Sequence, residues 1–133
     1  MSNPPEDDGD EVKNILKFDG DEKLLRSYIE KSPLACLVFS AVWCPSCRRL
    51  SQQIIQLAGK YQTVMFVHID VQESPELSSS FGVVKIPTTK ISRVDGDKIV
   101  EVAEIVGASA TRLKDKLNEL LPDNNAQEEP EQD

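Results

Sequence analysis

Two seven-residue apolar runs, at residues 34–40 (LACLVFS) and 64–70 (VMFVHID), constrain the fold of this chain more than any other feature. Apolar side chains occupy both alternating faces of each run, which is typical of a strand in a parallel sheet covered by helices on both sides. Between the runs, residues 45–60 repeat apolar side chains at helical spacing, as at Leu50 and Ile54. The sequence therefore predicts a β-α-β unit with a buried parallel sheet.

The rest of the chain continues this alternation. Asp19 or Asp21 can cap a helix after the first strand, Ser109 can cap the last helix, and Asp95-Gly96 predicts a hairpin. Further strands are expected at 12–18, 88–94 and 98–105, and further helices at 21–30, 75–80 and 110–121, the last one ended by Pro122. The order β-α-β-α-β-α-β-β-α predicts an α/β domain in which a mixed, mostly parallel sheet lies between two layers of helices.

Both ends of the chain are acidic. Residues 1–11 and 123–133 hold ten of the 23 acidic residues and no Lys or Arg, so 13 acids and 15 bases give the remainder a net charge of about +2. Such polar segments bury too little apolar surface to offset their ordering entropy. We expect a folded domain at 12–122 between two disordered acidic tails, and no nucleic-acid partner.

Targeting and membrane signals are not evident in the sequence. Its first eleven residues resemble neither a signal peptide nor a transit peptide, and no run approaches the roughly 20 apolar residues of a membrane span. Three cysteines are too few for a disulfide scaffold, and Cys36 lies in an apolar run, where we expect a buried, small hydrophobic residue. We expect a cytoplasmic, monomeric protein without membrane contact.

The other two cysteines lie where a predicted strand ends and the long helix begins. Cys44 occupies the helix entry and Cys47 the first turn, where free N–H groups and roughly half a positive charge from the helix dipole stabilise a thiolate. Pro45 suits the first helical position, and Ser46 and Arg48 can add a hydrogen bond and positive charge. We expect an exposed, attacking Cys44 whose pKa lies below the value of about 8.5 of a free thiol, and a sheltered, resolving Cys47.

A CxxC pair alone is compatible with several roles. A structural zinc site needs four ligands, and beyond the pair the chain offers only Cys36 and His68, both on strands expected to be buried. A structural disulfide across so small a ring would restrict the unfolded chain little. At a strand-to-helix junction of a β-α-β unit, the favoured interpretation is thiol–disulfide exchange, with no metal.

Four markers in the same order resemble the thioredoxin family and cover most of residues 12–121. VWCPSCRRL (42–50) resembles its WC-x-x-C motif, and KIPTT (85–89) its Ile-Pro-Thr, whose proline is cis. The stretch from Asp70 to Gly82 resembles the family's connection through a short helix, and IVGASATRLKDKL (105–117) its Val-Gly-Ala segment before the last helix. The resemblance implies the thioredoxin fold.

The resemblance also implies roles for individual residues. Cys44 is the implied nucleophile on a client disulfide, and Cys47 the residue that resolves the mixed disulfide and leaves a Cys44–Cys47 bridge. The implied substrate-binding residues are Trp43, Pro45, Ser46, Ile86, Pro87 (with a cis bond) and Gly107.

Several positions depart from the family's pattern. The family usually has a buried aspartate six residues before the first cysteine, where this chain has Val38, so we expect slower resolution. His68 aligns with the family's frequent lysine partner and is either a buried neutral residue or a pH-dependent substitute for the missing acid. Pro45-Ser46 replaces the usual Gly-Pro, as in glutaredoxins and tryparedoxins, which predicts a less reducing potential.

The resemblance implies a protein-disulfide reductase without a cofactor of its own. Its expected partners are disulfide-containing client proteins and a flavin-dependent thioredoxin reductase or another dithiol donor. The alternative is a binding module or redox-regulated adaptor of the same fold with weak or no turnover.

Overall fold

The computed structural model describes residues 13–121 and confirms the predicted order of elements. The tails predicted at 1–11 and 123–133, and the helix end predicted at Pro122, lie outside the described residues. The strands are β1 (Ile15–Phe18), β2 (Leu34–Ser40), β3 (Val64–Asp70), β4 (Thr88–Asp95) and β5 (Lys98–Val106), and the helices are α1 (Glu22–Ile29), α2 (Pro45–Lys60), α3 (Pro75–Ser80) and α4 (Ala110–Leu120).

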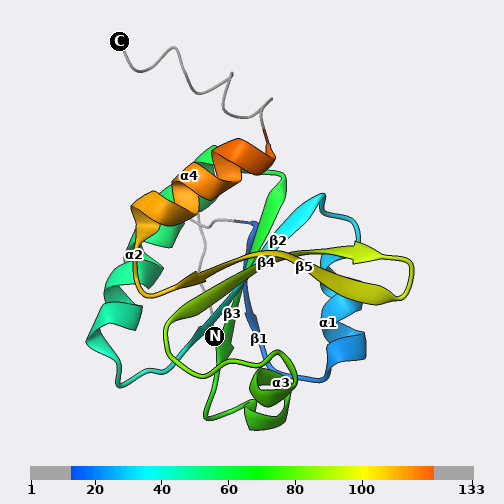
Figure 1. The fold of residues 1–133 in the computed structure, drawn as a ribbon, viewed down its shortest axis with the longest axis horizontal. Helices are drawn as coiled ribbons and strands as arrows, with labels where there is room; N and C mark the ends of the chain where they lie inside the picture. Colours follow the sequence, from blue (N-terminus) through cyan, green and yellow to red (C-terminus); the bar gives the residue numbers. More distant parts are fainter. Residues whose placement is uncertain (1–12, 122–133) are drawn as a thin grey trace, which may run out of the picture.

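The strands form one mixed sheet in the order β1-β3-β2-β4-β5. β1, β3 and β2 are parallel, whereas β4 is antiparallel to both β2 and β5. α2 and α4 cover one face, and α1 and α3 pack on the other (Figure 1). Because of these strand directions, the ends of β2, β3 and β5 and the start of β4 meet at one edge of the sheet.

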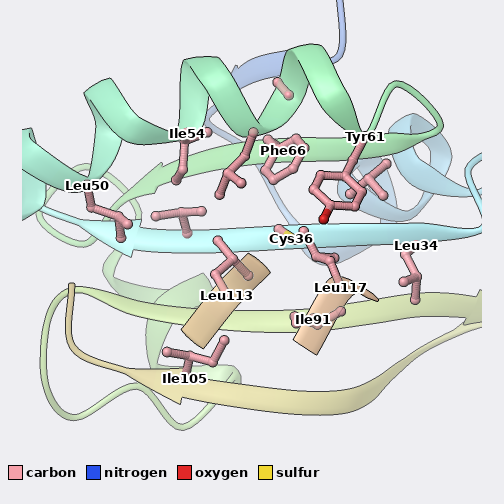
Figure 2. Close-up of a cluster of buried hydrophobic side chains, with 14 residues drawn as sticks. Leu34, Cys36, Leu50, Ile54, Tyr61, Phe66, Ile91, Ile105, Leu113 and Leu117 are labelled. Carbon is pink, nitrogen blue, oxygen red and sulfur yellow. The ribbon is translucent and has the colours of Figure 1, made fainter. Parts of the chain in front are cut away.

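Strand β2 supplies side chains to the hydrophobic clusters on both faces. Cys36 and Val38 belong to the cluster beneath α2 and α4, which Figure 2 shows, while Leu37 and Phe39 belong to the cluster beneath α1. All four residues are buried, which explains the continuous apolar run. Burial raises the pKa of the Cys36 thiol, so this sulfur stays protonated and unreactive at neutral pH.

The first strand starts at Ile15, later than predicted, and the side chain of Asn14 just before it makes contacts of its own. Its Nδ2 donates to the carbonyl oxygens of Ala58 and Tyr61, both at 3.1 Å, and of Val64 at 2.8 Å. The first two carbonyls belong to the end of α2, where intrahelical partners run out. Asn14 therefore ties the end of α2 to the start of β3.

Side-chain caps are present at the starts of α1 and α4, as the sequence predicts. Asp21, and not Asp19, caps α1 by accepting from the N–H of Leu24 at 2.9 Å. Ser109 caps α4 by accepting from the N–H of Arg112 at 3.1 Å.

Within the described residues, no helix has the length and apolar character needed to cross a membrane.

The hairpin turn lies one residue later than expected. Asp95 still belongs to β4 and pairs with Lys98, so the two-residue loop is Gly96-Asp97, with Gly96 at a φ of 65°. A positive φ in such a loop favours glycine because it has no Cβ.

A buried lysine on β4 is a feature that the sequence did not explain. Lys90 Nζ lies 3.1 Å from Glu101 Oε1 and 2.9 Å from Glu104 Oε2. Glu101 and Glu104 reach the same face, although they are three residues apart, because the β4–β5 register shifts between Ile91 and Ser92. Burial lowers the pKa of Lys90, but the hydrogen bonds to the two carboxylates outweigh it and raise the pKa overall.

Candidate active site

The cysteine pair lies at the edge where β2 passes into α2. Cys44 is the N-cap of α2 in an extended conformation, and Pro45 is the first helical residue. The backbone N–H of Cys47 donates to Cys44 Sγ at 3.3 Å, so sulfur takes the place of the oxygen of an ordinary N-cap. The predicted placement is confirmed.

The surroundings of Cys44 favour its thiolate. The pKa of Cys44 is lowered by a hydrogen bond from the Cys47 thiol and then by one from the hydroxyl of Ser46, whose Oγ lies 3.4 Å from Sγ. Burial raises this pKa and is outweighed. The N-terminal charge of α2 acts in the same direction as the hydrogen bonds.

Cys47 has the opposite chemistry. Burial, together with the hydrogen bond that its thiol gives to Cys44, raises the pKa of Cys47 to about 11. All three cysteines are free thiols in this structure. The expected contrast in exposure is small, because Cys44 is 6% exposed and Cys47 3%. Both cysteines are therefore buried as whole residues, but burial raises the pKa mainly of the Cys47 thiol.

Arg48 does not have the predicted role beside Cys44. Its Nη1 donates to the carbonyl oxygen of Val42 at 2.8 Å, which braces the turn before the helix. Its positive charge contributes to lowering the pKa of Cys47, where it is outweighed by burial, and does not count among the causes of the shift at Cys44.

An apolar surface surrounds the pair, and we call it the contact face. Its exposed members are Val42, Trp43, Val84 and Val106, of which Val84 is 90% and Trp43 59% exposed. They come from the loop before α2, the loop before β4 and the end of β5. The edge of the sheet described above brings these three segments together.

The loop before β4 presents backbone at this surface. The Ile86–Pro87 bond is cis, and Ile86 packs against the cluster that contains Cys44 and Cys47. The Pro87 carbonyl already accepts from the Gly107 N–H at 2.8 Å, whereas the backbone groups of Ile86 have no hydrogen-bond partner among residues 13–121. Gly107 has a φ of 106°, which favours glycine, and a Cβ there would meet no atom within 4 Å.

A cleft of about 650 Å³ lies behind the pair, between α2 and the β1–β3 side of the sheet. Cys47 and Arg48 line it from α2, His68 from β3 and Lys17 from β1. His68 pairs with Lys17 on one side and with Val38 on the other. Burial lowers the pKa of His68, and the charge of Lys17 lowers it further, so the imidazole is neutral at pH 7. Sequence reasoning singled out His68 but did not place it in one cleft with Cys47.

No metal centre is formed by the residues that the structure describes. Among them, no group of three or more His, Cys, Asp or Glu side chains is arranged to hold an ion. Cys36 and His68, the extra ligands that a zinc site would need, lie on different strands, with Cys36 sealed in the core.

Known proteins resemble this chain in sequence and in fold. The thioredoxin family model matches residues 18–119. Thioredoxin H2 of Arabidopsis thaliana is 30% identical over 113 residues, 83% of this chain and 82% of that protein. Trichomonas vaginalis thioredoxin superposes with a TM-score of 0.74 at 29% identity, over 80% of this chain and 97% of that one.

The chain also resembles a third solved structure. That structure comes from work on the thiol resolving mechanism in yeast mitochondrial 1-Cys peroxiredoxin via glutathione/thioredoxin systems. Its TM-score is 0.70 at 26% identity, and the match covers 81% of this chain and 97% of the other. With a strand-to-helix cysteine pair, a cis proline beside it and a family match over most of the sequence, this chain belongs to the thioredoxin family of thiol–disulfide oxidoreductases.

Proposed function

We propose that the chain reduces disulfide bonds in client proteins, with Cys44 as the nucleophile and Cys47 as the resolving residue. The observation that carries this assignment is the opposite direction of the two pKa shifts, lowered at Cys44 and raised to about 11 at Cys47. The thiolate is the reactive form of a cysteine, so the residue that ionises more readily attacks first.

The proposed reaction has two exchange steps. The Cys44 thiolate attacks one sulfur of the client disulfide, a Cys44–client bond forms, and the second client sulfur leaves as a thiolate. Cys47 then loses its proton and attacks Cys44 Sγ, which forms the Cys44–Cys47 disulfide and releases the first client sulfur. The client gains two electrons, which the Cys44–Cys47 dithiol supplies, and a separate dithiol donor must restore them.

The second step needs an acceptor for the Cys47 proton. At pH 7 a thiol with a pKa of about 11 is ionised in roughly one molecule in ten thousand. Cys44 carries no charge once it is bonded to the client, which removes one cause of this high pKa, but burial remains. We assign the acceptor role to neutral His68, acting through the solvent of the cleft that it shares with Cys47.

Client binding is assigned to the contact face. Trp43 supplies exposed apolar area, and the unpartnered backbone of Ile86 can form strand-like hydrogen bonds with an extended client segment. Pro87 has no N–H and its carbonyl is engaged by Gly107, so these two residues shape the loop. Pro45 and Ser46 lie at the helix entry beside the attacking sulfur.

The partners follow from the same chemistry. Clients with accessible disulfides are the substrates, and a peroxiredoxin is the kind of client suggested by the yeast structure named above. A flavin-dependent thioredoxin reductase or another dithiol donor returns the electrons. The cytoplasmic location remains a prediction from the sequence, since that yeast system is mitochondrial.

An insulin-reduction assay with dithiothreitol as electron donor tests the proposal. We expect turnover that Cys44→Ser abolishes and that Cys36→Ser retains, because Cys36 is sealed in the core. If the wild-type protein shows no turnover but binds a partner stably, the adaptor interpretation replaces the reductase.

A further inference from the structure

The three segments that form the contact face, extended by the first residues of α2 and α4, carry cations and no carboxylate. Residues 41–49 contain Arg48 and Arg49, residues 82–88 contain Lys85, and residues 105–114 contain Arg112 and Lys114, yet none of these segments has an Asp or Glu. The chain has 13 acidic residues outside its acidic ends, and none of them lies in these three segments. The face therefore has a local positive charge.

Two of these cations lie beside exposed apolar residues of the face. Arg112 Nη1 donates to the carbonyl oxygen of Val106 at 3.3 Å, which holds its guanidinium at the end of β5. Lys85 is exposed and follows Val84 in the loop before β4. Among residues 13–121, no carboxylate forms an ion pair with either side chain.

The nearest acid along β5 is Glu104, two residues before Val106. It shares Lys90 Nζ with Glu101, so this cluster has a net charge of −1, which offsets only part of the positive charge of Lys85 and Arg112. On the other side of the site, Asp19, Asp70 and Glu73 line the cleft together with Lys17 and Arg48 and offset the charge of these two cations.

The order of the strands places the acidic and the basic groups on opposite sides of Cys44. Asp70 ends β3 on one side of β2, whereas Lys85 precedes β4 and Arg112 follows β5 on the other side. Cys44, which follows β2, lies between the acidic and the basic side. A client segment that docks over Cys44 therefore meets acidic groups on the β3 side and basic groups on the β4–β5 side.

We propose that the contact face selects client disulfides that carry acidic side chains on the flank that docks over the β4–β5 side, where Lys85 and Arg112 bind them. This inference rests on the proposed reductase function and adds a substrate class to it. Exposed charges at the rim of a binding surface act chiefly on the association rate and are screened by salt. Two exposed ion pairs predict a preference of roughly 2- to 30-fold in kcat/KM at low ionic strength.

The test compares two peptides that contain the same disulfide loop, flanked on one side by two aspartates in one and by two lysines in the other, and the pair is made once for each side of the loop. In the pair whose charged flank docks over the β4–β5 side, we expect faster reduction of the acidic peptide by the wild-type protein, reversal of this order in Lys85→Glu/Arg112→Glu, and loss of the difference at high salt. Glutamate at position 112 falls in the first turn of α4, where the helix dipole favours an acid, so the variant should fold.

Two controls make the result specific. Lys23→Glu/Lys31→Glu changes the net charge equally at exposed positions in and after α1, away from the contact face, and should keep the wild-type preference. Hydroxyethyl disulfide, a small uncharged substrate, should be reduced equally by all three proteins. Equal kcat/KM for the two peptides in both pairs overturns the substrate inference, whereas reduction of neither the peptides nor the small disulfide overturns the reductase itself.

Discussion

The backbone N–H of Cys47 lies 3.3 Å from Cys44 Sγ, so the resolving residue stabilises the attacking thiolate before it attacks in turn. The Cys47 thiol is also the first cause of the lowered pKa of Cys44. Burial is the largest cause of the raised pKa of Cys47, and the hydrogen bond that its thiol gives to Cys44 raises it further. This hydrogen bond and the burial of Cys47 together set the order of ionisation and, with it, the order of the two chemical steps.

The Ser46 hydroxyl provides the first prediction. Ser46→Ala removes a hydrogen bond to the thiolate, so we expect a higher pKa of Cys44 and a smaller rate constant for attack at pH 7. The measurement is the ultraviolet absorbance of the thiolate as a function of pH. Ser79→Ala, at an exposed position in α3, is the matched control and should leave the midpoint unchanged. An unaltered midpoint in Ser46→Ala would show that the Cys47 thiol and the helix end activate the sulfur without the hydroxyl.

His68 provides a kinetic prediction. His68→Gln keeps a polar side chain but cannot accept a proton at neutral pH, so the Cys44–client mixed disulfide should decay more slowly, by about 10- to 100-fold. Stopped-flow measurement of client release in single turnover separates this step from the attack by Cys44, whose rate should not change. In the wild type, release should slow as pH falls through the lowered pKa of His68. A decay rate that is the same in both proteins at every pH would leave solvent as the proton acceptor.

The same histidine predicts how stability depends on pH. Because the folded pKa of His68 is lowered, the unfolded chain binds more protons between that value and the unfolded value of about 6.5. The free energy of unfolding should therefore decrease as pH falls through this window. His68 is the only histidine in the chain, so His68→Gln should flatten the dependence of urea-denaturation midpoints on pH as pH falls below about 6.5, the unfolded value. A slope that persists in the variant would assign the effect to other groups.

Much of this architecture could be predicted because its signals are local. The bounds of β2, α2, β3 and α3 follow from apolar periodicity and helix caps, and the site follows from Cys44 and Cys47 at one junction. The shared cleft of Cys47 and His68 could not be derived in this way. It depends on β3 lying between β1 and β2, a long-range pairing that no local pattern encodes.

The small exposure of Cys44 was missed for a related reason. A helix N-terminus predicts the direction of a pKa shift, but not the packing around the residue, to which Ile86 contributes from a loop more than thirty residues away in sequence. The ion pairs of Lys90 were missed because a register shift, which the strand pattern does not show, brings Glu101 and Glu104 to one face.

The Lys90 cluster predicts an asymmetry between two substitutions. Lys90→Met replaces a buried cation by an apolar side chain of similar length and leaves two carboxylates that are 41% exposed, so it should change stability little. Glu101→Gln/Glu104→Gln leaves the 7% exposed ammonium without a counter-charge and should cost about 3 kcal/mol, the lower end for a broken buried pair. Urea unfolding at neutral pH measures both. Equal losses in the two variants would mean that the ion pairs themselves stabilise the hairpin.

Asn14 provides a last prediction, on what holds α2 and therefore the cysteine pair in place. Its amide reaches three carbonyl oxygens, of Ala58, Tyr61 and Val64, in a partly buried position. Asn14→Ala leaves these oxygens with fewer partners, and since an unsatisfied buried acceptor costs about 1–3 kcal/mol, we expect a loss of about 2 kcal/mol in the free energy of unfolding.

Gln62→Ala is the control. Gln62 also donates to a carbonyl near the end of α2, that of Gly59 at 3.0 Å, but it does so at an exposed site, where water can replace its side chain. Its effect should remain within about 0.5 kcal/mol. Equal effects of the two substitutions in urea denaturation would show that burial of the Asn14 amide contributes nothing, and that the end of α2 is held by packing alone.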